Sequence, residues 1–375
     1  MRRTYCVLVA LALQAAALCL PSTALAATHL SGGTLSTNTT WTTTGSPYVL
    51  DGTVTVASGV TLTIDPGVIV KFNGQLRQLI VNGTLHAVGT NSQEIYFTSL
   101  KDDSVGGDTG GDGATTGSPG QWLDIELNNS TTSDIEYATI RYGGYGTNIT
   151  WGAVKLNSGA ANFSHDVVTN NLKTGLIVSG STTSPPYPAM TVDHSVVQSN
   201  HDGMYINDGS LDLSGNSDVD YNTAYGIRFN IPNSTGAEPA ASTIFHSEVR
   251  GNGDWGVYLG VGTAVSDYPH GSYNNIYENQ GYVNLTEGHI GQLTVPYVNL
   301  SDNWEYNYFG GATNVDCPFG PLGDQIVGDV HHQGPVVATQ YLGPPPPPNE
   351  PQQWCYGNNV DTLNTSGSLI DNSGY

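Results

Sequence analysis

The chain has 375 residues, and its 32 acidic and 10 basic side chains give a formal net charge of −22 at pH 7. This excess of acid excludes nucleic acid as a partner, because binding to phosphates requires clustered Lys and Arg. The acidity fits either a solvated surface that binds cations weakly or calcium-dependent assembly outside the cell.

Residues 1–26 have the pattern of a secretory signal peptide. Arg2 and Arg3 precede an apolar stretch that ends in Ala24-Leu25-Ala26. No later stretch approaches the roughly 18 consecutive apolar residues that a membrane-spanning helix needs. We therefore expect the mature chain to have no transmembrane segment and to be secreted, extracellular or held at the cell surface.

Residues 47–100 consist of short apolar runs such as TVTVASG, VTLTIDPG and VIVKFNG. Each run is rich in Val and Thr and stops at Gly, Asn, Asp or Pro, as expected for strands that end in tight turns. No helical periodicity competes with this pattern, so we expect an all-β protein from the first mature residues.

Between residues 167 and 260 one phrase returns four times: VVTNNLKTGLIVSG, VVQSNHDGMYINDG, VDYNTAYGIRFN and VRGNGDWGVYLG. Each copy has an apolar run, an Asn, a Gly and a second alternating run, and Gly152 marks a looser earlier copy. Repetition with a variable period is typical of a solenoid. Hairpin sheets would instead show two-residue turns between equal strands, so we expect coils stacked in parallel.

These phrases, together with VTLTIDPGVIVKFNG and PGQWLDIELNNSTTSDIEYATIRYGG, resemble the right-handed parallel β-helix family, which includes pectate lyases and polygalacturonases. The resemblance covers about residues 45–345 and implies a single-stranded, pectin lyase-like solenoid of about ten coils. We expect three parts: the signal peptide over 1–26, the parallel β-helix over 27–345, and a proline-rich linker with a short tail over 346–375.

The same resemblance implies an asparagine ladder. In this family a repeated Asn lies at a tight bend between sheets, where its side chain satisfies backbone donors and tolerates a left-handed backbone. The ladder would consist of Asn171, Asn200, Asn222 and Asn252.

The insertion KDDSVGGDTGGDG is a candidate calcium site. It places Asp102, Asp103, Asp108 and Asp112 among glycines, and oxygen ligands of this kind suit calcium. The spacing is not that of an EF-hand, and the loop could equally be a solvated turn.

Two residues after the glycine of each repeat copy lies an outward-facing residue, and these residues form a strip of Ile177, Tyr205, Arg228 and Tyr258. Lys155 joins it if the first copy is one residue out of phase. Aromatic rings can stack on sugars, and Lys and Arg can pair with uronate carboxylates, so this strip is a candidate ligand-binding site for an acidic polysaccharide. Alternatively, these long side chains only cover the sheet and pair with nearby carboxylates.

The residue before each rung glycine gives a second strip, formed by Trp151, Thr174, Asp202, Tyr225 and Trp255, which could bind glycan or simply join adjacent turns. His201 and Asp202 are weak candidates for acid-base catalysis. The resemblance to lyases, which use an Arg or Lys beside aspartate-bound calcium, adds Arg228 beside Asp202, but the lyase signatures themselves are missing.

Cys317 and Cys355 remain after signal removal, and we expect them to form a disulfide in an oxidising compartment. For function, the sequence favours a secreted or cell-surface protein that binds carbohydrate or extracellular matrix without catalysis, with calcium as a possible cofactor. The alternatives are a polysaccharide lyase or epimerase acting on uronates, and a structural or adhesin module.

Overall fold

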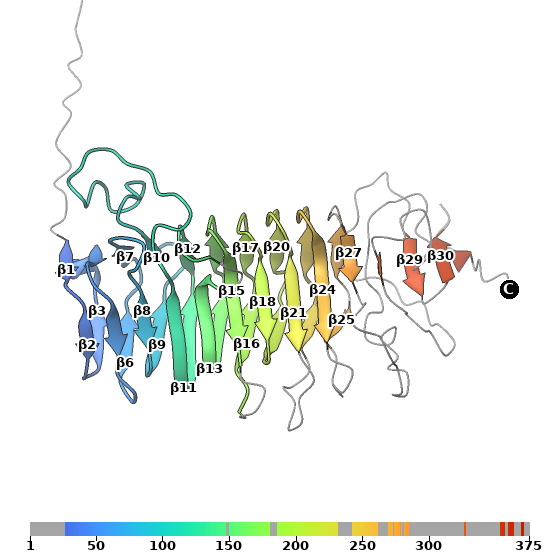
Figure 1. The fold of residues 1–375 in the computed structure, drawn as a ribbon, viewed down its shortest axis with the longest axis horizontal. Coiled ribbons are helices and arrows are strands. Elements are labelled where there is room, and N and C mark those ends of the chain that lie inside the picture. Colours follow the sequence, from blue (N-terminus) through green and yellow to red (C-terminus); the bar gives the residue numbers. More distant parts are fainter. Residues whose placement is uncertain are drawn as a thin grey trace, which may run out of the picture.

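The computed structural model describes residues 27–147, 150–180, 186–231, 242–261, 269–272, 274–277, 279, 281–284, 326–327, 353–356, 359–363 and 369–370. Residues 1–26, most of 285–345 and the proline-rich linker lie outside this part of the chain, so the signal peptide and the proposed domain boundaries stay predictions. Figure 1 shows the described strands as successive rungs of an elongated solenoid.

Three ladders of parallel strands run along the solenoid, and the chain visits them in the order A, B, C in each coil. Ladder A consists of β1 (Thr28–Leu30), β4 (Tyr48–Leu50), β7 (Ile69–Phe72), β10 (Ile95–Ser99), β12 (Ala138–Arg141), β14 (Val167–Thr169), β17 (Val196–Gln198), β20 (Asp218–Asp220), β23 (Glu248–Arg250) and β26 (Asn275–Tyr277). Its ten strands match the predicted coil number.

Ladders B and C are joined through two long strands, β11 (Ile125–Glu136) and β13 (Gly152–Ser164), whose first halves belong to B and second halves to C. Ladder B also contains β2 (Gly33–Leu35), β5 (Val54–Val56), β8 (Leu79–Val81), β15 (Thr174–Ser179), β18 (Met204–Asn207), β21 (Ile227–Ile231), β24 (Trp255–Val261) and β27 (Gly281–Asn284). Ladder C also contains β3 (Thr39–Trp41), β6 (Thr61–Ile64), β9 (Thr84–Val88), β16 (Ala189–Asp193), β19 (Ser210–Ser214), β22 (Thr243–Phe245) and β25 (His270–Ser272).

Few described elements lie outside the three ladders. One 3-10 turn, η1 (Thr43–Gly45), precedes β4. An antiparallel sheet joins β29 (Gln353–Tyr356), β30 (Asn359–Leu363) and β31 (Leu369–Ile370), whereas β28 (Ile326–Val327) pairs in parallel with β27 and so extends ladder B. The prediction of an all-β parallel β-helix is confirmed.

The core is a column of like side chains within the ladders. Adjacent strands pair in register, so each inward apolar residue lies over its equivalent in the next coil. In ladder A this column is fully buried and contains Val70, Phe97, Ile140, Val168, Val197, Val219, Val249 and Ile276. The β-branched residues of the repeat therefore serve the stacking of the coils.

A ladder of buried asparagines lies at the bend between ladders A and B. The Nδ2 of Asn200 donates to Asn222 Oδ1 at 3.2 Å, and the Nδ2 of Asn222 donates to Asn252 Oδ1 at 3.0 Å. The same bonds link Asn171 to Asn200 and Asn252 to Asn279. The left-handed backbone is found one position earlier, at Asn170, Ser199 and Tyr221, and not at the ladder asparagines.

The asparagine ladder explains why each copy of the repeat has a glycine shortly after its asparagine, at the start of the ladder B strand. A Cβ on Gly203 would lie 2.8 Å from Asn222 Nδ2 and 2.5 Å from the carbonyl oxygen of Gly226. The equivalent Cβ on Gly226 would lie 2.8 Å from Asn252 Nδ2. The asparagine amides fill the inside of this bend, so no side chain fits at the glycine positions.

Candidate functional site

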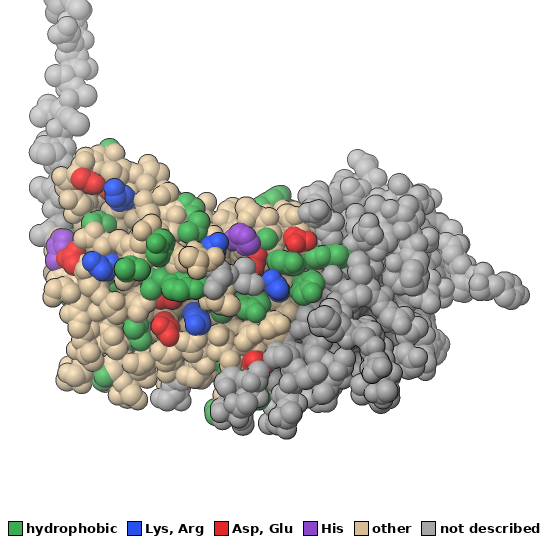
Figure 2. Space-filling model, in the orientation of Figure 1, with side chains coloured by type: hydrophobic (Ala, Val, Ile, Leu, Met, Phe, Trp, Pro, Cys, Tyr) green, Lys and Arg blue, Asp and Glu red, His purple; other side chains and the backbone are tan. Residues whose placement is uncertain are grey.

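One column of outward side chains runs along ladder B with one member per coil, and we call this column the ladder B strip. It contains Glu126, Lys155, Ile177, Tyr205, Arg228 and Tyr258. Lys155 pairs with Ile177, so Gly152 rather than Trp151 aligns with Thr174. Over the middle of the solenoid, where β15, β18 and β21 lie in Figure 1, Figure 2 shows hydrophobic side chains gathered with charged side chains of both signs.

Arg228 is surrounded by tyrosine rings. Its guanidinium carbon lies 5.0 Å from the ring centre of Tyr225, 5.5 Å from that of Tyr258 and 5.7 Å from that of Tyr205. The rings of Tyr225 and Tyr258 contact each other edge to face at 5.4 Å. Stacking of this kind holds a guanidinium in place and leaves its N–H groups free to bind an anion.

Two residues predicted to be exposed on this strip are buried. Ile177 is 0% exposed, and Tyr205 is 7% exposed. Neighbouring strands lie only about 4.8 Å apart, so a long side chain such as Arg228 covers the ring in the next coil. Burial also raises the pKa of the Tyr205 hydroxyl. The ladder B strip therefore presents Arg228 and Tyr258 at one end, with Tyr225 packed beside them, and Lys155 with Glu126 at the other.

His201 and Asp202 form a hydrogen-bonded pair beside this strip. The imidazole Nδ1 lies 2.9 Å from Asp202 Oδ1, and the Asp202 side chain is fully buried. The second oxygen, Oδ2, is buried without a hydrogen-bond partner. In the second predicted strip Thr174 is also buried, and Trp151 falls outside the column because it precedes Gly152.

Asp124 is a candidate that the sequence analysis missed. It lies directly before β11, is 8% exposed, and its Oδ1 is buried without a partner. Burial, with the negative charge of Glu126 as a smaller cause, raises its pKa to about 7, and Lys155 opposes this rise. A carboxyl group that titrates near neutrality suits proton transfer. The phrase QWLDIEL gave no signal, because only the fold shows that this aspartate is buried.

The four aspartates of the acidic loop do not converge on one point. Asp102 is buried against Arg141, which contacts it through Nε at 2.8 Å and through an ion pair at 2.7 Å. Asp103 accepts from the backbone N–H and the hydroxyl of Thr115, and Asp108 accepts from backbone N–H groups of residues 111–113, while Asp112 is exposed. Within the described ranges, no three His, Cys, Asp or Glu side chains lie close enough to hold a metal ion.

The loop packs on ladder A instead. Lys71, on the outer face of ladder A, is fully buried, and its Nζ donates to the carbonyl oxygen of Gly107 at 2.9 Å. Burial lowers the pKa of Lys71, and Asp103, Asp102 and Asp108 oppose that shift. The aspartates of the loop therefore neutralise Lys71 and Arg141 of ladder A.

Other predicted sites lie partly or wholly outside the described residues. Cys317 is outside them, so its disulfide with Cys355 stays a prediction. In the part of the chain that the structure describes, no helix is long and apolar enough to cross a membrane.

Comparison with known proteins agrees with this fold. The family description "Pectate-lyase like beta helix domain" matches residues 33–152. No curated protein matches the sequence.

Two solved structures are similar at low identity. The periplasmic alginate epimerase AlgG has a TM-score of 0.30 and 11% identity over 68% of this chain and 73% of that chain. The A-module of the Azotobacter vinelandii mannuronan C-5 epimerase AlgE6 has a TM-score of 0.29 and 10% identity over 71% of this chain and 92% of that chain. Likeness at this level carries no conclusion about activity.

Proposed function

We propose that this chain, a parallel β-helix protein with a pectate-lyase-like domain over residues 33–152, is a secreted or cell-surface protein that binds an acidic polysaccharide along the ladder B strip without chemical change. Uronate carboxylates would pair with Arg228 and Lys155, and the edges of Tyr225 and Tyr258 would pack against sugar rings.

The observation that carries the proposal is the state of Arg228. Among the described arginines, Arg141 and Arg250 form ion pairs with carboxylates, whereas Arg77 and Arg228 form none, and of these two Arg228 is the one that lies on the ladder B strip and stacks on tyrosine rings. Its Nε is buried without a hydrogen-bond partner. In a chain with 32 acidic and only 10 basic residues, a stacked guanidinium without a carboxylate partner is well suited to an external anion.

Lys155 supplies a second cation on the same strip. It lies three strands from Arg228, through Ile177 and Tyr205, which corresponds to about 14 Å along the solenoid axis. Lys155 also makes no ion pair with a described carboxylate. A polymer that runs along the axis could place carboxylates on both groups at once, and two linked contacts bind more tightly than either alone.

The test compares two arginines in binding to polygalacturonate and alginate, with dextran as the neutral control. Arg228→Ala is expected to weaken uronate binding at least about tenfold, because a charge-assisted bidentate contact is lost. Arg250→Ala is the matched control, because Arg250 also stacks on a tyrosine, Tyr221 at 5.4 Å, but already pairs with Asp220. Equal binding by both variants would remove the strip as the polysaccharide site.

A polysaccharide lyase or epimerase is the second candidate. It is favoured by the buried Asp202 carboxylate with its unpartnered Oδ2, held by His201 beside the strip. Incubation with uronates would reveal a lyase by the ultraviolet absorbance of unsaturated sugar ends, and an epimerase by NMR of the sugar protons. Binding to uronates with neither change supports the non-catalytic function.

A further inference from the structure

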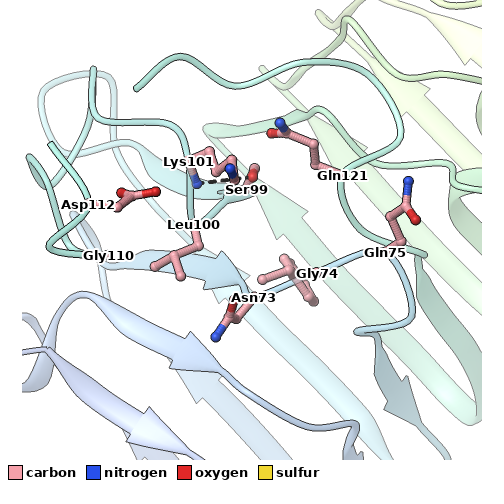
Figure 3. A pocket seen from close by; sticks show the side chains of 10 residues that line it. Asn73, Gly74, Gln75, Ser99, Leu100, Lys101, Gly110, Asp112 and Gln121 are labelled. Atoms are coloured by element: carbon pink, nitrogen blue, oxygen red, sulfur yellow. Dashed lines mark hydrogen bonds between the residues drawn. The ribbon is translucent and has the colours of Figure 1, made fainter. Parts of the chain in front are cut away.

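The acidic loop forms one wall of a cavity. The loop over residues 101–121 crosses the outer side of the bend between β7 and β8, and a cavity of about 360 Å³ lies between them. Figure 3 shows Asp112 on one side, Gln75 and Gln121 on the opposite side, and Asn73 below, directly after β7. A volume of this size is at the small end of the range for binding pockets.

The floor and frame of this cavity are rigid. Leu100, which is half-buried, supplies the apolar surface of the floor, and beneath it the fully buried Phe72 stacks on Trp122 with ring centres 4.2 Å apart and planes 7° apart. The indole N–H of Trp122 donates to the carbonyl oxygen of Arg141 at 2.8 Å, and Arg141 is the residue that holds Asp102 of the loop. The loop is thus fastened at the sheet on one side of the cavity, so the cavity is present before any ligand arrives.

The polar groups on the walls fall into two kinds. Two amides have a fixed orientation: Asn73 Nδ2 donates to Asp51 Oδ1 at 2.7 Å, and Gln121 Oε1 accepts from the Ser118 N–H at 3.1 Å. The second atom of each amide, Asn73 Oδ1 or Gln121 Nε2, is therefore left to bind another partner.

Three further side chains, Gln75, Lys101 and Asp112, make no side-chain hydrogen bond to the rest of the described protein, and Lys101 and Asp112 do not pair with each other. A Cβ on Gly74 would meet no atom within 4 Å, so the entrance is open.

We propose that this cavity binds one neutral sugar unit. A free carboxylate, a free ammonium and three amides around a small apolar floor present both donors and acceptors, which is what vicinal hydroxyls require because each hydroxyl donates and accepts. Asp112 is the carboxylate that lines the cavity, and Lys101 balances its charge, so the cavity has no excess of positive charge that would favour a uronate, which separates this site from the ladder B strip.

Saturation-transfer NMR with the full mature chain tests the proposal. The probes are the methyl glycosides of glucose, galactose and mannose, each at about 10 mM, which suffices to detect a site with a Kd near 1 mM. Methyl galacturonide is the charged comparison. We expect transfer to at least one neutral glycoside and a weaker signal for the uronide.

Variants locate the signal. Asp112→Asn and Gln75→Ala are expected to weaken binding of the neutral glycoside about tenfold or more. Asp212→Asn, at an exposed aspartate on ladder C, is the matched control and should bind as the wild type does. Absence of transfer to every neutral glycoside, or a stronger signal for the uronide, would overturn the proposal. So would wild-type binding of the neutral glycoside by Asp112→Asn and Gln75→Ala, and melting temperatures equal to that of the wild type show that the variants are folded.

Discussion

Replacement of Asn222 by alanine tests the asparagine ladder most directly. The Asn222 side chain accepts from the backbone N–H and the Nδ2 of Asn200, at 3.0 and 3.2 Å. Its own Nδ2 donates to the Val197 carbonyl oxygen at 3.1 Å and to Asn252 Oδ1 at 3.0 Å. Alanine removes all four bonds, although Asn252 Oδ1 still accepts from the backbone N–H of residue 222 and Asn200 Nδ2 still donates to the Val168 carbonyl oxygen.

The expected loss of unfolding free energy is about 4 kcal/mol, from about 1 kcal/mol for each net hydrogen bond. Unpaired buried groups add to this loss, and relaxation of the bend reduces it. The matched control is Asn162→Ala. Asn162 is an exposed residue of β13 whose Nδ2 donates only to Asp134 Oδ1, at 2.9 Å, so its replacement should cost less than about 1 kcal/mol.

Urea unfolding followed by circular dichroism measures both variants, and the slope of the transition shows whether the unfolding remains comparable. Native-state hydrogen exchange adds location, because coils interact only with their neighbours. Amides of β18 and β24 should lose protection in Asn222→Ala, whereas those of β5 and β8 should not. If Asn222→Ala costs no more than Asn162→Ala, the ladder bonds do not stabilise the bend.

Three other outcomes follow from the described contacts. The pKa of Asp124 is about 7 in the folded protein, above the ordinary value of 3.8 that applies to the unfolded chain, so folding favours its protonated form. The free energy of unfolding should therefore decrease as pH rises from about 4 to about 7, by up to roughly 4 kcal/mol. Asp124→Asn should remove this part of the pH dependence of the urea midpoint, and parallel curves for variant and wild type would contradict it. Gly203→Ala should lower the melting temperature, at a cost of about 2 kcal/mol, because its Cβ would contact the Gly226 carbonyl oxygen at 2.5 Å; an unchanged melt would show that the bend can yield. Chelation of calcium should leave the melting temperature unchanged, because Asp102 is already paired with Arg141; a decrease would show a bound ion.

The stacking of the coils could be predicted from the sequence because it depends on local residues. Asn, Gly and the β-branched runs recur in the order that the bend and the core require, and the offset considered for Lys155 corresponds to its pairing with Ile177. Within a coil, the side-chain period of two then gives which residues face inward.

Exposure and long-range pairing could not be predicted in the same way. Tyr205 faces outward but is covered by the neighbouring coil, which depends on the size of Arg228 and on its conformation. The partner of Asp102 is Arg141, 39 residues later in the chain. No sequence pattern connects the two, because the loop crosses the sheet rather than following the repeat.

The bend between ladders C and A was missed for a different reason. Its buried ladder uses Asp166, Ser195 and Ser217: the Asp166 N–H donates to the Ser195 hydroxyl, and the Ser195 N–H donates to the Ser217 hydroxyl of the next coil. The residues before them, including His165 and His194, have a left-handed backbone, and these two imidazoles stack with ring centres 4.9 Å apart. Serine and histidine are common on surfaces, so their recurrence did not mark a bend.

The asparagine ladder also bears on how a protein of this kind can change in length. Inside the row, each amide oxygen accepts a hydrogen bond from the asparagine of the coil before it, and each amide Nδ2 donates one to the asparagine of the coil after it. The inner asparagines are therefore interchangeable. Gene duplication or deletion of one entire winding would rejoin the row without any new chemistry at the junction. Loss of a single amide would instead leave an interruption that no neighbour can repair, so such chains should vary by whole windings more readily than by point changes at this bend.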